Sequence, residues 1–201
     1  MITIVDYGMG NLGSVLNMFK RIGVKAIISS DIEEITKASK LLLPGVGAFD
    51  AAVKRINDGG FRKILDYKAL DECVPILGIC LGMQLLMNSS EEGELAGLGW
   101  IDGSAHRFPK LPGLKVPHMG WNIVLPENES ALTSQLPDEA RFYFVHSYFV
   151  TVENAQNSIL KATHGITFDA AIQRNNIYGA QFHPEKSHKF GMQLLKNFSN
   201  I

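Results

Sequence analysis

Short apolar runs alternate with helical patterns through the first half of the chain, and this alternation constrains the fold more than any other feature. The apolar runs lie at residues 2–6, 24–29, 40–43 and 75–79. Strands that alternate with amphipathic helices in this way build a parallel sheet covered by helices. The run at 75–79 has no polar residue, which is typical of a strand at the sheet centre, buried on both faces.

The second half has a different pattern. Residues 91–126 are rich in Gly and Pro, with short β-prone pieces, whereas residues 142–145 form an aromatic run of strand type. A further strand is expected at 177–182 and a closing helix at 188–198. We therefore predict an α/β fold, an open and mostly parallel sheet flanked by helices with an antiparallel β extension. No linker or repeat interrupts it, so residues 1–201 are expected to form a single domain.

The composition excludes several classes of protein. With 201 residues, of which 46% are apolar, the chain can bury a sizeable core, which excludes disorder, collagen and coiled coil. The 19 basic residues balance 20 acidic ones, so a small zwitterionic or uncharged substrate fits better than nucleic acid or an anionic membrane. Two cysteines cannot build a disulfide framework, and the longest apolar stretch, at 74–83, is too short to span a bilayer. We expect a cytoplasmic protein.

The strongest chemical signal is Gly-Ile-Cys-Leu-Gly at residues 78–82. A cysteine between glycines, after a strand and before a helix, is typical of a nucleophile elbow, in which the backbone turns sharply around the reactive side chain. The helix expected at 81–87 would direct its N-terminus at Cys80 and favour the thiolate, and the N–H of Leu81 would face a developing oxyanion. The alternative is that Cys80 is a small buried hydrophobic residue, but the flanking pattern favours the nucleophile.

A thiolate nucleophile needs a base, and His183 with Glu185 is the best candidate pair. Residues two apart in an extended segment point the same way, and Pro184 favours extended geometry at His183. Glu185 should therefore approach the imidazole and stabilise its charged form. A metal site built from His183, Glu185 and His188 is disfavoured, because the spacing does not match a helical zinc motif. No metal is expected.

Weaker signals lie in four other places. The Gly-rich loop at residues 44–49 follows a strand and could supply a second oxyanion donor, or be an ordinary turn. Gln84 could meet a polar substrate, although an exposed Gln is the more usual case. Residues 115–122 place Trp, His and Lys in a Pro/Gly loop that suits either a partner surface or a local plug. Residues 146–148 could line a pocket, and Cys73 is interpreted as structural.

Taken together, these motifs resemble the class I, or triad, glutamine amidotransferases. The elbow at residues 78–82 and Phe-His-Pro-Glu at residues 182–185 are similar to signatures of the whole class. Within the class, five segments in order resemble the glutaminase subunits of imidazole glycerol phosphate synthases: residues 6–11, 44–49, 115–122, 144–148 and 183–187. The similarity runs essentially from end to end. One departure lies at residues 188–190, His-Lys-Phe, where a less bulky and more acidic run is expected.

The resemblance implies a flavodoxin-like fold, a reaction and roles for individual residues. Glutamine would be hydrolysed to glutamate and ammonia through a thioester on Cys80, with His183 as general base and acid and Glu185 orienting it. Leu81 and Val46 would supply oxyanion N–H groups. The residues implied to hold the glutamine are Gly47, Gln84, His146, Ser147 and Tyr148. No cofactor is implied.

The resemblance also implies a partner. Ammonia would pass to a (β/α)8 cyclase subunit of a heterodimer, which makes imidazole glycerol phosphate and an aminoimidazole carboxamide ribotide in histidine biosynthesis. Asn11, Trp121 and Lys186 match positions at that subunit contact. The nearest alternative is a paralogous glutaminase subunit that feeds a sugar-amidating synthase of surface polysaccharide biosynthesis. A non-catalytic binding domain and an autonomous peptidase or γ-glutamyl hydrolase are further alternatives, disfavoured by the intact Cys80, His183 and Glu185 and by the partner-type segments.

Overall fold

The computed structural model describes residues 1–201. Its α-helices are α1 (Leu12–Arg21), α2 (Ile32–Thr36), α3 (Phe49–Asp58), α4 (Phe61–Asp66), α5 (Leu81–Leu85) and α6 (His188–Asn200). Its strands are β1 (Ile2–Val5), β2 (Ala26–Ser29), β3 (Leu41–Gly45), β4 (Ile76–Cys80), β5 (Ser89–Ser90), β6 (Gly103–Arg107), β7 (His118–Ile123), β8 (Leu125–Pro126), β9 (Arg141–His146), β10 (Tyr148–Val152), β11 (Ser158–His164), β12 (Ile166–Arg174) and β13 (Ile177–Ala180). None of the helices is long and apolar enough to cross a membrane.

Eleven strands form one sheet in the order β2-β1-β3-β4-β13-β12-β10-β6-β5, with β11 and β8 paired beyond β12. The first five strands of this order are all parallel, whereas β12 runs antiparallel to β13 and to β10. The order β2-β1-β3-β4 is that of a flavodoxin-like sheet. The α/β fold predicted from the sequence, parallel with an antiparallel extension, is thus confirmed.

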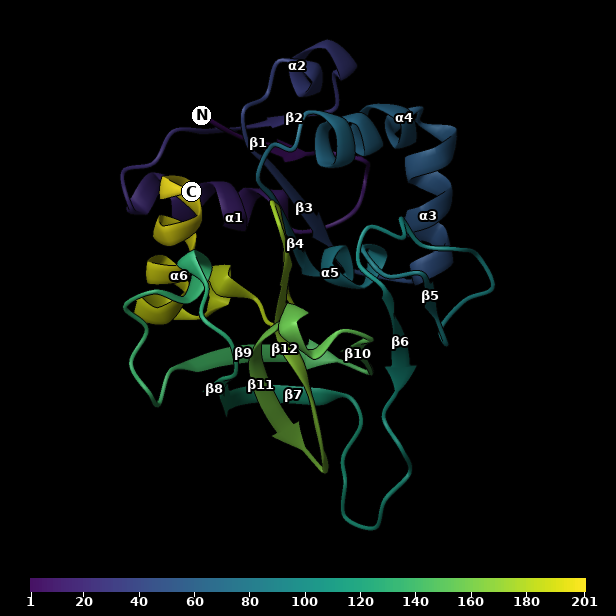
Figure 1. The fold of residues 1–201 in the computed structure, drawn as a ribbon, viewed down its shortest axis with the longest axis vertical. Helices are drawn as coiled ribbons and strands as arrows, with labels where there is room; N and C mark the ends of the chain where they lie inside the picture. The colour runs from purple at the N-terminus through teal and green to yellow at the C-terminus, as the bar shows by residue number, and fades with distance from the viewer.

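Helices cover both faces of the parallel strands (Figure 1), with α1 and α6 on one side and α3 and α4 on the other. Successive side chains of a strand point to opposite faces, so each strand supplies both layers. Leu42 and Leu77 belong to the core beside α1 and α6, whereas Leu41, Leu43 and Ile76 belong to the core beside α3 and α4. This explains why the strand at 75–79 has no polar residue.

Local structure departs from a regular α-helix in one segment and from the expected loop in another. The helix that begins at Phe61 ends as an α-helix at Asp66 and continues as a π-helical turn over Tyr67–Asp71, in which the buried Lys68 binds Thr36 O and Glu72. The segment at 115–122 is a loop only in its first part, because His118 begins strand β7. This strand pairs with β9 in a separate two-stranded sheet.

Candidate active site

Cys80 occupies a sharp turn between the central strand and a helix. It is the last residue of β4 and the residue before α5, with φ 54° and ψ −110°, which is an unfavourable conformation for a residue with a side chain. The turn packs against β3 without room for side chains at the flanking glycines. A Cβ at Gly82 would lie 1.8 Å from Leu43 O, and one at Gly78 would lie 2.6 Å from Gly82 O. The predicted elbow geometry is present.

His183 and Glu185 form a buried hydrogen-bonded pair close to the same end of the sheet. Nδ1 of His183 lies 2.8 Å from Oε1 of Glu185, and both side chains are almost fully buried. The proximity was predicted, but the reason was wrong: only His183 is extended, and Glu185 lies in a 3-10 turn over Pro184–Lys186 that bends it back to the ring. Because a carboxylate accepts, Nδ1 carries a proton and Nε2 is left for chemistry.

Charge determines the protonation state of His183. Burial by itself lowers the pKa of His183, but Cys80 and Glu185 both favour the charged ring and raise its pKa to about 9. Nε2 of His183 is buried and has no hydrogen-bond partner in the chain. The sulfur of Cys80 makes only long contacts, 4.0 Å to Val145 O and 3.9 Å to Nε2 of Gln181. The Cys80 sulfur therefore shares a pocket with an imidazole nitrogen that has no other hydrogen-bond partner.

Cys80 and His183 open into one pocket of about 350 Å³. The residues that line it are Val46, Gly47, Cys80, Leu81, Gln84, Glu92, Pro117, Val145, His146, Ser147, Tyr148 and His183. All the residues predicted to act as nucleophile, base, oxyanion donors and glutamine contacts therefore meet in one place. Glu185 lies behind His183, outside the lining.

Hydrogen bonds hold the polar side chains of the lining in place. Gln84 is buried, not exposed, and its Nε2 donates to Tyr148 O at 3.1 Å and to Oε1 of Gln181 at 3.3 Å. The ring of His146 is held by Tyr148 O at 2.7 Å and by His118 at 2.9 Å. Because that ring has no free nitrogen, His146 offers the pocket mainly its backbone.

Among the residues of the site that were not found from the sequence, Glu92 and Tyr7 make the most informative contacts. Glu92 lines the pocket, accepts the N–H of Phe49 at 3.0 Å, and has a pKa raised mainly by burial. Its loop is placed by Asp50, which accepts the N–H groups of Glu94 and Leu95, and no local pattern signals this. The second is Tyr7, whose buried hydroxyl donates to Pro44 O at 2.6 Å and so fixes the loop that carries Val46.

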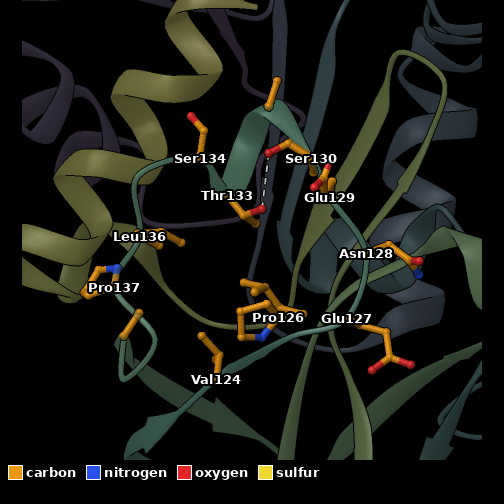
Figure 2. Close-up of a pocket in the computed structure, with 13 residues that line it drawn as sticks. Val124, Pro126, Glu127, Asn128, Glu129, Ser130, Thr133, Ser134, Leu136 and Pro137 are labelled. Atoms are coloured by element: carbon orange, nitrogen blue, oxygen red, sulfur yellow. Dashed lines mark hydrogen bonds between the residues drawn. The ribbon is translucent and has the colours of Figure 1, made fainter.

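A larger hollow of about 570 Å³ lies elsewhere, under the segment 124–140 (Figure 2). It contains no cysteine or histidine, and Glu127 and Glu129 are its only ionisable residues. Figure 2 shows that apolar and polar side chains both line this hollow, with the Thr133 hydroxyl bonded to Ser130 O. Size does not decide between the two pockets; only the smaller one has a nucleophile and a base. Cys73, on the exposed surface, lines neither.

The three predicted partner contacts are exposed, and two of them share a surface. The Trp121 side chain is 47% exposed and stacks on His188, with ring centroids 5.5 Å apart. Tyr143 links it to Lys186, whose Nζ lies 5.8 Å from the Tyr143 ring centroid. Asn11 caps α1, a helix that packs against the turn carrying Lys186. His188 stacks on Trp121, and the structure has no group of three His, Cys, Asp or Glu side chains placed to hold a metal ion.

Comparison with known proteins identifies the family. The model of the class-I glutamine amidotransferases matches residues 3–200, so this chain belongs to the class-I glutamine amidotransferase family. Among its relatives are proteins named imidazole glycerol phosphate synthase subunit HisH from Bdellovibrio bacteriovorus, 50% identical over all of both chains, and subunit HisH 2 from Methanococcus maripaludis, 51% identical over 98% of both. A subunit HisH 2 from Pseudomonas aeruginosa is 50% identical over all of both chains.

Solved structures agree with the fold. A crystal structure described as a glutamine amidotransferase superposes with a TM-score of 0.76 at 14% identity, covering 100% of this chain and 99% of the other. The structure of PurLQS from Thermotoga maritima gives a TM-score of 0.74 at 16% identity, covering 99% of this chain and 97% of the matched chain. At such low identity the likeness concerns the fold alone.

Proposed function

We propose that this chain is the glutaminase subunit of an imidazole glycerol phosphate synthase and hydrolyses glutamine to glutamate and ammonia. The observation that carries the proposal is that a thiol at a strained elbow, Cys80, shares one pocket with the His183–Glu185 pair. Relatives of the same length and about half-identical sequence bear the name of this synthase's HisH subunit. We also propose that residues 1–201 work as one glutaminase domain.

The reaction follows from the positions of the groups. Nε2 of His183 holds the proton of Cys80 in a thiolate–imidazolium pair, and the thiolate sulfur attacks the side-chain amide carbon of glutamine. The N–H groups of Leu81 and Val46 stabilise the oxyanion. The imidazolium then protonates the departing ammonia and leaves a thioester on Cys80. Next, His183 removes a proton from water, which attacks the thioester and releases glutamate. Glu185 stabilises the imidazolium at each step, and no cofactor is needed.

The pocket also suits the charged end of glutamine. The carboxylate of Glu92 faces the same pocket as Cys80, so it can pair with the α-ammonium group. Gln84, Gly47 and the backbone of residues 146–148 supply polar groups for the rest of the substrate. Pairing with the α-ammonium group gives the Glu92 carboxylate a reason to lie in the pocket wall.

A continuous apolar surface suits a partner subunit. Along β7 and β8 every second residue is exposed and apolar: Met119, Trp121, Ile123 and Leu125. An exposed stripe of this kind, edged by Lys186, is typical of a protein interface. We propose that it receives a (β/α)8 cyclase subunit that makes imidazole glycerol phosphate and an aminoimidazole carboxamide ribotide. A cytoplasmic location is proposed because it would keep the Cys80 thiol reduced.

The test is glutamate release by the purified chain, measured alone, with a candidate cyclase and its ribotide substrate, and with a candidate sugar-amidating synthase. We expect slow hydrolysis alone and at least about tenfold stimulation by the cyclase, because docking would couple ammonia production to its use. Stimulation only by the sugar-amidating synthase would assign the chain to the other pathway. Equal rates in all three arms would indicate an autonomous hydrolase.

A further inference from the structure

A chain of hydrogen bonds connects strand β7 with the pocket of Cys80. Nδ2 of Asn122 donates to Nε2 of His118 at 3.1 Å, and Nδ1 of His118 lies 2.9 Å from Nε2 of His146. Nδ1 of His146 lies 2.7 Å from Tyr148 O. The two imidazoles face each other across the β7–β9 ladder, and His118 and His146 are only 4% and 6% exposed. None of these three side chains takes part in the reaction proposed above.

The proton positions in this series of hydrogen bonds are fixed by its last acceptor, Tyr148 O. Tyr148 O cannot donate, so Nδ1 of His146 carries a proton and Nε2 of the neutral ring accepts. His118 must then donate from Nδ1, which leaves its Nε2 to accept from Asn122. Burial lowers the pKa of His118 to about 4, with His164 adding to the effect, and burial lowers that of His146 to about 3. Both rings are therefore neutral at pH 7, and each tautomer is defined.

The chain continues into the pocket. Tyr148 O also accepts from Nε2 of Gln84 at 3.1 Å, and the same amide nitrogen donates to Oε1 of Gln181 at 3.3 Å. The Gln181 amide in turn points its Nε2 at the sulfur of Cys80, at 3.9 Å. The orientation of the Gln84 amide, which faces the substrate, thus depends on a carbonyl that His146 and His118 hold in place.

We propose that His118 is a positioning residue for glutamine binding: through His146 it fixes the Tyr148 carbonyl and, through that carbonyl, the Gln84 amide. The inference rests on the proposed glutaminase function. It assigns a role to the histidine of the segment 115–122, which lies in the strand that carries the exposed apolar stripe. If β7 moved, the hydrogen bonds from His118 through His146 and Tyr148 O to Gln84 would carry that movement to the substrate pocket.

The test separates the hydrogen bond from the packing of the ring. In His118→Phe the ring remains to stack on Phe144, but the donor to His146 is lost. His118→Asn retains a side-chain N–H at the position of Nδ1. The matched control is His164→Phe. His164 stacks on His118 at 4.2 Å and binds Lys115 O, but it makes no hydrogen bond to Asn122, His118 or His146. Glutamate release by each variant is measured over a range of glutamine concentrations.

We expect His118→Phe to raise KM for glutamine about tenfold and to leave kcat within about threefold of wild type. A tenfold change corresponds to the loss of roughly one oriented hydrogen bond. His118→Asn and His164→Phe should keep KM within about twofold. His118→Gln also lacks the donor at the Nδ1 position, so its KM should match that of His118→Phe. If His118→Phe does not fold, His118→Gln takes its place in the test.

Two outcomes would overturn the positioning role: an unchanged KM in the variants that lack the donor, or an equal rise in His164→Phe and His118→Asn. If wild-type protein releases no glutamate with any partner, it is the glutaminase function that fails. That result is distinguishable from failure of the positioning role, which requires an active wild type.

Discussion

Cys73 and Cys80 both have positive φ, 56° and 54°, so backbone strain alone does not distinguish them. Their surroundings do. Cys73 is exposed and its sulfur contacts only Leu70 O, whereas Cys80 is buried at the end of the central strand beside His183. Strain is therefore informative at Cys80 because a base and an enclosed pocket accompany it.

Cys80 and, after it, Glu185 keep His183 protonated against the effect of burial. Since the pKa of His183 is raised to about 9, above its ordinary value of 6.5, the ring is charged at pH 7 and loses its proton only as the pH rises through about 9. In Glu185→Gln we expect this pKa to fall and glutamate release to drop roughly 100-fold or more. NMR titration of the His183 ring checks the first effect, and a wild-type ring that titrates at 6.5 or below would contradict it.

Among single residues, the sequence was sufficient to predict the roles of those that belong to local motifs. Cys80 stands between two glycines and His183 lies two positions from Glu185, so their chemistry could be predicted from spacing. Glu92 and Tyr7 could not, because each reaches the site through a tertiary hydrogen bond, to Phe49 and to Pro44. A contact between residues some forty positions apart leaves no local pattern.

Among the elements, the turn from β4 into α5 has almost no free space. A Cβ at Gly82 would overlap the backbone carbonyl of Leu43, which cannot move without breaking β3. We expect Gly82→Ala to lower the free energy of unfolding by more than about 3 kcal/mol. Gly13, in α1, has nothing within 4 Å of an added Cβ, so Gly13→Ala should raise that free energy by about 0.5 kcal/mol.

Urea unfolding of both glycine variants measures this difference directly. Equal stabilities would mean that the elbow does not pack against β3 as the structure has it.

The alternation of strands and helices was predictable because each βα unit has its own hydrophobic periodicity. Strand β7 was not. Its sequence is interrupted by Gly120 and preceded by Pro117, which favour a loop, and it is a strand only because β9 pairs with it from His118 opposite His146 to Ile123 opposite Arg141. The π-helical turn at 67–71 likewise depends on a distant group, since Lys68 reaches Thr36 O.

At the scale of the whole molecule, the parallel strands bring the site together. Gly45 and Cys80 end β3 and β4, Tyr7 follows β1, and His183 follows β13, so the carboxyl ends of four neighbouring strands meet at one edge of the sheet. Ligands bind at this edge in open α/β sheets. The position of the site is therefore a property of the fold, and its chemistry a property of Cys80 and His183.

The buried histidines make the stability of the whole fold dependent on pH. The pKa values of His118 and His146, about 4 and about 3, lie below the ordinary 6.5, so the unfolded chain binds protons that the folded chain excludes. Stability is thus present above pH 6.5 and is lost as the pH falls toward 4. Between pH 7 and pH 5 we expect a loss of about 2 kcal/mol for each ring.

Urea unfolding at the two pH values tests this dependence. The variant His118→Phe should lose about half of it, and a wild-type stability that does not change between pH 7 and pH 5 would show that the rings are not buried in neutral form.

The central claim is that Cys80 attacks the side-chain carbonyl of glutamine. The most direct test is to incubate the protein with a chloroketone analogue of glutamine, from which a thiolate displaces chloride, and to locate the adduct by peptide mass mapping. We predict one adduct, on Cys80, that forms faster than on Cys73 and is suppressed by excess glutamine. An adduct on Cys73 alone, or labelling of Cys80 that glutamine does not suppress, would contradict the account.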